Sequence, residues 1–140
     1  MPEQYNISFA NEDQNNVSVW LLKPGVTQIP ESYFECQYGE EFVDQPINQF
    51  AADFGFRNYD EDFAELQILD SPLPITELIS PHSYGSPYFE AAAQAATANQ
   101  ITHSSGLFII HNFEYDPAQT HKSQSDYFQF IGYFPFDPNS

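Results

Sequence analysis

The sequence predicts an α+β fold: a single two-layer domain in which helices pack on a mixed, mainly antiparallel sheet of about four strands. Three observations support this class. The length of 140 residues suits one domain. Leu, Ile, Val and Phe account for 35 of the 140 residues, which exceeds the roughly 20 % needed for a folded chain. Strand-like and helix-like patterns alternate along the chain, and no internal repeat is present.

The chain begins with a polar N-terminal segment at residues 1–16, and the domain itself is expected over residues 17–136. A run of β-branched and aromatic residues at 17–22 predicts the first strand, which the turn residues Pro24 and Gly25 end. A short helix is expected to follow, from Pro30 to near Gly39.

A second helix is predicted around a stripe of apolar residues at spacings of four, three and four. Its first turn contains Pro46, and Gly55 takes the left-handed position after its end. The stripe faces the core and comprises Val43, Ile47, Phe50 and Phe54. Residues 63–69 then predict a second strand, bounded by Asp70-Ser71-Pro72, with a helical turn possible at its start.

Two helical segments precede the last two strands. One or two helical turns are expected over residues 74–79, followed by a longer alanine-rich helix. Ser86 is predicted to cap this helix, Pro87 to be its first residue and Asn99 to stop it.

The last two strands are expected at residues 106–115 and 127–136, paired as an antiparallel hairpin. Strict alternation in the last strand would put its phenylalanines on one buried face and its tyrosines on the other. Gly132 in the middle of that strand predicts a bulge or a closely approaching backbone.

The formal charge of −17 comes mainly from a shortage of cations. Asp and Glu number 20, whereas Lys23, Arg57 and Lys122 are the only lysines and arginines. Charged residues are only 16 % of the chain, below the roughly 25 % of an ordinary domain. Such a field repels nucleic acid and anionic membranes and attracts basic proteins or cations, so nucleic-acid binding is disfavoured.

The carboxylates concentrate between residues 31 and 77, which contain 12 of the 20, with Arg57 as the only Lys or Arg. At the centre of this stretch lies the string Tyr59-Asp60-Glu61-Asp62-Phe63-Ala64-Glu65. Three interpretations remain open. The string is a solvated loop that caps helix ends, a cation site using Asp60, Asp62 and Glu65, or a docking patch with Tyr59 and Phe63 as aromatic anchors.

Patterns typical of enzymes are weak in this sequence. The acidic string lacks the glycine and the last glutamate of an EF-hand loop, and the four histidines lack metal-ligand spacing. No serine or glycine motif of a hydrolase or nucleotide-binding protein is present. The single cysteine, Cys36, is given no role. We therefore expect a protein without catalytic activity, cofactor or metal. The alternative is a cation-dependent hydrolase or cation-binding protein that uses Asp60, Asp62 and Glu65, and a third interpretation is an acidic interaction module.

The start of the chain has no signal peptide pattern, and no stretch of 18 apolar residues occurs, so we expect a cytoplasmic protein.

Six strings, in order, resemble the immunity protein 22 family of bacterial polymorphic toxin systems. They are Val17-Ser18-Val19-Trp20-Leu21, Gln49-Phe50-Ala51-Ala52-Asp53-Phe54-Gly55, the acidic string at 59–65, His82-Ser83-Tyr84, Phe113-Glu114-Tyr115 and Phe130-Ile131-Gly132-Tyr133-Phe134-Pro135-Phe136. The chain departs from the family pattern at Asn48, where a serine often begins the second string.

The resemblance implies a cytosolic antidote, without activity of its own, that binds the C-terminal domain of a toxin encoded beside it. Many such toxins are nucleases, whose cationic groove an acidic protein complements. The resemblance sets no oligomeric state. The residues expected to contact the toxin are Glu31, Glu35, Glu40, Glu41, Asp44, Tyr59, Asp60, Glu61, Asp62 and Glu65.

Overall fold

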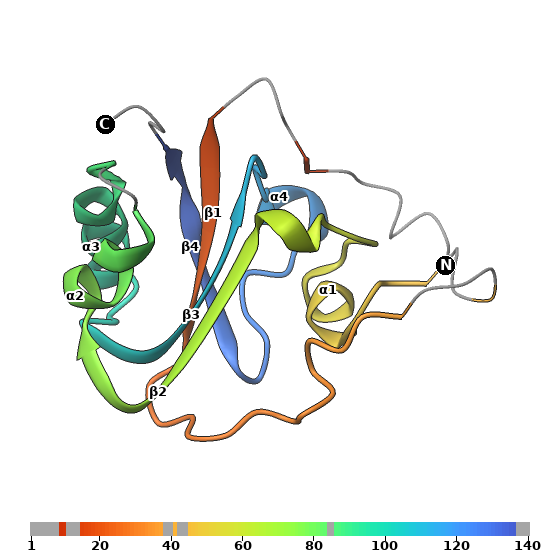
Figure 1. Cartoon of the computed structure of the whole chain (residues 1–140), viewed down its shortest axis with the longest axis horizontal. Coiled ribbons are helices and arrows are strands. Elements are labelled where there is room, and N and C mark those ends of the chain that lie inside the picture. The colour runs from red at the N-terminus through yellow and green to blue at the C-terminus, as the bar shows by residue number, and fades with distance from the viewer. Residues whose placement is uncertain (1–8, 11–14, 38–40, 42–44, 84–85, 137–140) are drawn as a thin grey trace.

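A four-stranded antiparallel sheet forms the centre of the computed structural model, which describes residues 9–10, 15–37, 41, 45–83 and 86–136. Its strands lie in the order β2-β3-β1-β4 (Figure 1). They are β1 (Asn16–Leu22), β2 (Ala64–Pro74), β3 (His103–His111) and β4 (Phe128–Pro135). The predicted α+β class and strand number are confirmed, and every pairing between these strands is antiparallel.

Helices lie on both faces of the sheet, so the fold has one layer more than predicted (Figure 1). The short helix α1 (Gln49–Phe54) covers one face, and α2 (Ile75–Ile79) and α3 (Tyr88–Ala98) cover the other. Three shorter elements complete the described fold: the 3₁₀ turns η3 (Glu61–Phe63) and η4 (Ser80–His82), and α4 (Pro117–Thr120).

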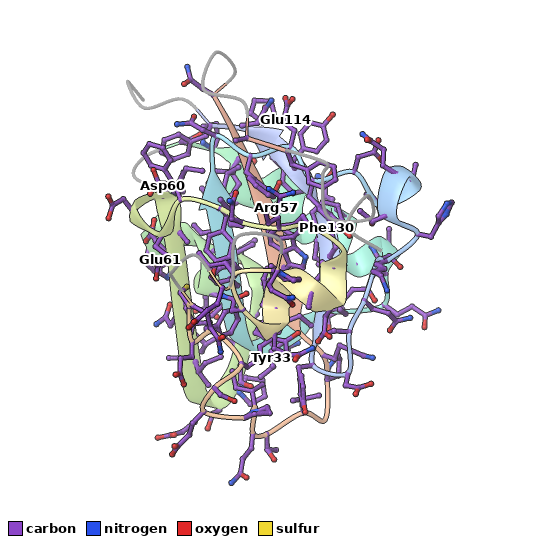
Figure 2. The ribbon with its side chains drawn as sticks, turned by 90° about the vertical axis from the view of Figure 1, so that its right-hand side faces the viewer. Tyr33, Arg57, Asp60, Glu61, Glu114 and Phe130 are labelled. Carbon is purple, nitrogen blue, oxygen red and sulfur yellow. The ribbon has the colours of Figure 1, made fainter. Side chains whose placement is uncertain are left out.

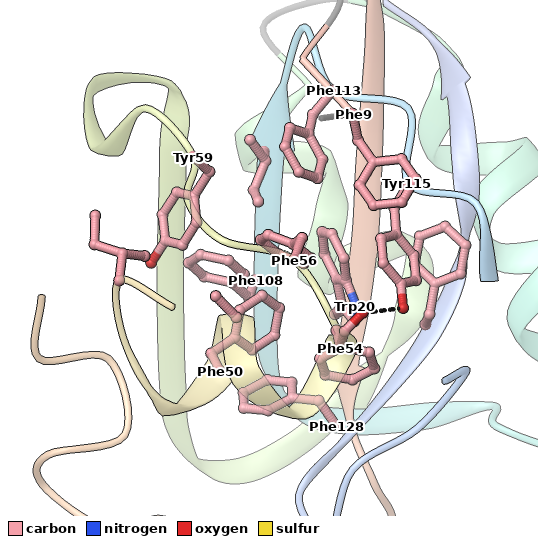
Figure 3. Close-up of a cluster of buried hydrophobic side chains, with 14 of the residues drawn as sticks. Phe9, Trp20, Phe50, Phe54, Phe56, Tyr59, Phe108, Phe113, Tyr115 and Phe128 are labelled. Carbon is pink, nitrogen blue, oxygen red and sulfur yellow. Dashed lines mark hydrogen bonds between the residues drawn. The ribbon is translucent and has the colours of Figure 1, made fainter. Parts of the chain in front are cut away.

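The face beneath α1 carries an aromatic core (Figure 3). Trp20 of β1 is fully buried at its centre and meets Phe50 and Phe54 of α1 in edge-on contacts. Tyr115, which follows β3, donates a hydrogen bond from its hydroxyl to the Phe54 carbonyl at 2.5 Å. Edge-to-face packing of this kind adds about 0.5–1.5 kcal/mol per pair beyond burial itself, so this core fixes the position of α1.

The opposite face carries an aliphatic core between the sheet and the helices α2 and α3. Val17, Val19 and Leu21 of β1 point into it, while Trp20 and Leu22 point into the aromatic core. Because both faces of β1 are buried, its sequence is a nearly continuous run of apolar residues.

The predicted hairpin between the last two strands is wrong, because β1 lies between β3 and β4 and pairs with both. Residues 112–127 connect β3 to β4, and this length permits a crossing over one strand where a tight hairpin turn would not. The most apolar strand thereby obtains neighbours at both edges.

The bulge predicted at Gly132 is confirmed, and it overturns the predicted single face of phenylalanines. Val19 pairs with Gly132 and Trp20 with Phe130, which leaves Ile131 as the extra residue in β4. Gly132 has φ +150°, a conformation that L side chains rarely adopt. After the bulge the faces exchange, so Phe130 packs in the aromatic core and Phe134 against the aliphatic one.

One predicted helix is a turn in the structure, and another is shorter than predicted. Residues 31–34 form a turn rather than a helix, held by bonds such as Tyr33 N–H to the Pro30 carbonyl at 3.0 Å. Helix α1 starts after its N-cap Asn48 instead of near Pro46, although Gly55 ends it in the left-handed conformation as predicted. Val43 of the predicted stripe lies outside the described residues.

The other boundaries differ by small steps. Helix α3 has Pro87, not Ser86, as its N-cap, and Asn99 ends it as predicted. Strand β2 continues through Asp70-Ser71-Pro72 to Pro74, with an irregular register between Ile68 and Leu73. An edge strand tolerates this, because its outer backbone groups need no partner strand and proline removes none of the ladder bonds there.

Candidate functional site

Six of the ten predicted contact residues are exposed carboxylates in two segments of the chain. Glu40 and Asp44 lie outside the described residues, and Tyr59 and Glu65 are at least partly buried. We call the exposed set the acidic face, and it comprises Glu31, Glu35, Glu41, Asp60, Glu61 and Asp62.

Backbone hydrogen bonds hold the two segments of the acidic face beside each other. The Gln37 N–H donates to the Ile47 carbonyl at 2.8 Å, and the Ile47 N–H donates to the Arg57 carbonyl at 2.6 Å. The three irregular stretches around residues 37, 47 and 57 are thus hydrogen-bonded side by side. Residues 31–37 and the turn at 60–62 therefore approach each other across this link.

A direct contact between the two segments occurs at Cys36 and Glu61. Burial, together with the nearby Glu61 carboxylate, raises the pKa of the Cys36 thiol to about 11. A thiol with this pKa stays protonated at neutral pH, so Cys36 is not a nucleophile there. Figure 2 shows Asp60 and Glu61 at the same side of the molecule as β2.

A shallow hollow of about 380 Å³ brings Glu35 and Glu41 to one rim. Polar side chains including Ser32 and Gln49 line it, together with Pro46. This hollow continues the acidic face toward the start of α1, where the helix dipole favours negative charge.

The side chain of Asn48 connects helix α1 to the acidic string. Its Oδ1 accepts a hydrogen bond from the Ala51 N–H at 2.9 Å, which caps α1. Its Nδ2 donates to the Tyr59 hydroxyl at 2.8 Å. The next residue, Asp60, caps η3 by accepting from the Asp62 N–H at 2.9 Å. These bonds fix the N-terminal side of the turn that presents Glu61 and Asp62.

Tyr59 is a core residue and not a surface anchor. Only 9 % of its surface is exposed, and its ring meets Phe108 and Phe50 in the aromatic core. Burial raises the pKa of its hydroxyl well above the ordinary value. We therefore correct the expectation that Tyr59 is an exposed aromatic among the charges, whereas Phe63 is 36 % exposed.

Glu65 lies on the other face of β2, where it holds two histidines. Its Oε1 is 2.9 Å from His82 Nδ1, and its Oε2 is 3.0 Å from His111 Nε2. The second ring nitrogen of His82 lies 2.6 Å from Gln67 Oε1. This network joins η4, β2 and β3 in one cluster. No spacing in the sequence predicted it, because its members come from three separate elements.

These placements separate the three carboxylates of the cation-site alternative. Asp60 is engaged with a backbone N–H of its own turn, and Glu65 is directed toward the two histidines. Within the described part of the chain, no group of three His, Cys, Asp or Glu side chains has the arrangement of a metal site.

Sequence reasoning missed two surface residues beside the acidic string. Leu66 and Ile68 follow it on β2 and are 44 % and 43 % exposed. Their alternation with Glu65 and Gln67 shows that they share one face of the strand, but it does not tell an exposed apolar side chain from a buried one.

None of the helices among the described residues combines the length and apolar character required to cross a membrane. A family model described as Immunity protein 22 matches residues 17–137, most of the chain. Comparison with curated proteins and comparison with solved structures each found no match.

Proposed function

The chain belongs to the Immunity protein 22 family, and from this premise we propose that it is a cytoplasmic antidote that binds and neutralises one cognate toxin. Family membership supports a toxin-neutralising role. The finer proposal is that the partner is the C-terminal domain of a polymorphic toxin, with a basic surface typical of a nuclease. The antidote has no catalytic step in this proposal: it acts by stoichiometric binding.

The observation that carries this proposal is the acidic face. Six exposed carboxylates project from two segments that backbone bonds fasten together. A nuclease requires a cationic groove because its substrate carries one negative charge per phosphate. Carboxylates on a fixed turn can occupy such a groove in place of phosphates. Binding of this kind blocks substrate entry and is favoured by charge complementarity.

The position of Asp60, Glu61 and Asp62 suits this role. Their turn is held rigidly by the Asn48 and Tyr59 hydrogen bond and by the Asp60 cap, so little conformational entropy is lost on binding. Exposed Phe63 follows the turn directly and adds apolar contact area beside the charges.

The direct test is co-expression with the toxin encoded next to this chain. We expect the wild-type chain to restore growth and to form a stable one-to-one complex with the toxin domain. Failure to rescue cells, together with failure to bind, would end the proposal.

Charge reversal then tests the acidic face. The variant Glu61→Lys with Asp62→Lys should weaken toxin binding strongly. The matched control is Glu77→Lys with Glu90→Lys, which makes the same charge change at exposed positions on α2 and α3. Equal loss of binding in both variants would show that total charge, and not this face, determines recognition.

A further inference from the structure

Most of the exposed large hydrophobic side chains of the described residues lie at one edge of the sheet. This edge is next to the turn at residues 60–62, which we call the acidic turn. Four large hydrophobic side chains are exposed among all the described residues, and three of them are Phe63, Leu66 and Ile68. The fourth, Tyr133, lies on β4 at the opposite edge. Such clustering at one edge strand, on a molecule of charge −17, marks an interaction site more than scattered exposure does.

The fold explains why these side chains are exposed. Leu66 and Ile68 pair with Phe108 and Gly106 of β3, on the face of the sheet that the aromatic core covers. That core is centred on Trp20 and α1, and its cover does not extend over β2, the edge strand (Figure 1). The aromatic face therefore ends in an uncovered apolar strip.

The backbone of β2 is regular only beside this strip. Residues 64–68 keep an unbroken antiparallel register with β3, from Ala64 opposite Ile110 to Ile68 opposite Gly106. The rest of the strand carries the features that prevent edge pairing, namely the irregular register before Leu73 and the prolines Pro72 and Pro74. The part of β2 after Ile68 is thus protected against pairing with another strand, whereas the apolar part at residues 64–68 is not.

A cavity of about 610 Å³ lies at the end of the strip. Ile68, Leu69 and Asp70 line one side, and the turn at residues 23–27 lines another. Its size suits one or two large side chains of a partner. The strip consequently has the acidic turn at one end and, at the other, a cavity whose lining includes both Asp70 and Lys23.

We propose that residues 64–68 of β2 accept an extended segment of the toxin as a fifth strand of the sheet, an inference that rests on the proposed function. Main-chain hydrogen bonds would form along the outer edge of β2. The partner segment would place apolar side chains on Leu66 and Ile68, and one of them in the cavity. Its lysines or arginines would face Asp60, Glu61 and Asp62.

Charge decides between this occupant and a second copy of the chain. Antiparallel pairing of two β2 edges would bring the acidic turn of each copy toward Asp70 of the other. Such a pair would bring carboxylates of the two copies together at both of its ends, whereas the lysines or arginines of a basic segment would face the exposed carboxylates at 60–62.

The experiment measures binding of the toxin domain from the adjacent gene, used as a catalytically inactive form. The double variant Leu66→Thr with Ile68→Thr replaces both apolar side chains with threonine, a β-branched residue that favours strands, and keeps the net charge. Tyr133→Thr is the matched control at the other edge. We expect the double variant to bind about tenfold more weakly or worse, the control to bind like wild type, and both to unfold near the wild-type temperature.

Amide hydrogen exchange of the wild-type complex tests the main-chain part. Amides within residues 64–68 should gain protection on toxin binding, while those of β4 should not. Unchanged exchange in 64–68, or wild-type affinity of the double variant, would overturn the edge-strand inference while leaving toxin binding intact. A wild-type chain that does not bind the toxin would instead overturn the proposed function. A dimer in ultracentrifugation that the double variant abolishes would assign the edge to a second copy and also overturn the inference.

Discussion

Neighbouring residues of the acidic string have different functions in the folded chain. Asp60, Glu61 and Asp62 are exposed, whereas Tyr59 packs in the aromatic core and Glu65 connects two histidines on the opposite face of β2. The string therefore combines a presented turn with the residues that anchor it. Which of its carboxylates contact the toxin stays a prediction, to be tested residue by residue.

Replacing Glu65 with Gln tests its scaffold role. The change removes the charge that His82 and His111 share, and we expect the free energy of unfolding to fall by about 1–2 kcal/mol. Toxin affinity of the folded variant should stay near that of wild type. Chemical denaturation measures the first effect and calorimetry the second. The control is Glu61→Gln, for which the reverse pattern is expected; weakened binding without lost stability in Glu65→Gln would refute the assignment.

The buried hydroxyl of Tyr115 links α1 to the segment after α4. It donates to the Phe54 carbonyl and lies 2.6 Å from both the Lys122 carbonyl and Thr120 Oγ1. Tyr115→Phe removes the single O–H that serves the Phe54 and Lys122 carbonyls, so we expect a loss of about 1–3 kcal/mol in thermal or chemical unfolding. A loss below about 0.5 kcal/mol would show that water replaces the hydroxyl.

Alkaline pH should destabilise the fold through the same residue. Burial raises the pKa of Tyr115 to about 12, above the value of 10.0 for an unperturbed tyrosine. The folded state thus holds the proton more tightly, and its stability should decline as pH rises from about 10 through 12. Tyr115→Phe should reduce this slope, and part should remain because burial also raises the pKa values of Tyr33 and Tyr59. Denaturation series at pH 8 to 12 measure both slopes.

At the scale of elements, helix α1 is too short to be stable alone and depends on its cap and its aromatic contacts. Asn48→Ala removes the cap and the donor to Tyr59 together, and should cost about 1–3 kcal/mol in chemical unfolding. Asn48→Ser can keep the cap but not the Tyr59 bond, so its loss should be intermediate.

The control for this prediction is Gln49→Ala, which removes only an exposed hydrogen bond to Asp53 on the same helix. Its effect should stay within about 0.5 kcal/mol. If Asn48→Ala were as mild as this control, the cap would not be what positions the acidic turn.

The strands illustrate what local patterns can and cannot specify. The run at 17–22 and the glycine at 132 predicted a buried strand and a bulge, and both are present. The pairing of the last two strands was predicted incorrectly. β1, from the start of the chain, lies between them, and the local pattern of β3 and β4 does not contain this information. The exchanged faces after Ile131 follow from the bulge, whose register shift alternation alone does not contain.

At the scale of the whole molecule, the charge of −17 is distributed over an accessible surface of 7837 Å². An even distribution gives only about two net charges for a typical binding face of ~800 Å². The acidic face gathers six carboxylates, so its local field exceeds the average. Concentration of charge, rather than the total, is what suits recognition of a basic partner.

This concentration predicts a salt-dependent encounter with the toxin. Raising salt from about 0.01 M to 0.15 M shortens the screening length from about 30 Å to about 8 Å. The association rate should therefore fall markedly, while the dissociation rate changes less. Stopped-flow mixing or surface-based kinetics with the inactive toxin domain gives both rates. An association rate independent of salt would contradict electrostatic steering and leave steric blocking as the mechanism.

The sequence by itself determined the α+β class, the resemblance to the family, the cation shortage and the location of the carboxylates along the chain. These features depend on composition or on periodicities of two and 3.6 residues, which are local. Only the tertiary structure decided that β1 separates β3 from β4, that Tyr59 is buried and Glu65 is directed to two histidines, and that Leu66 and Ile68 are exposed beside the acidic turn. Burial and pairing depend on partners distant in the sequence, and no local pattern contains them.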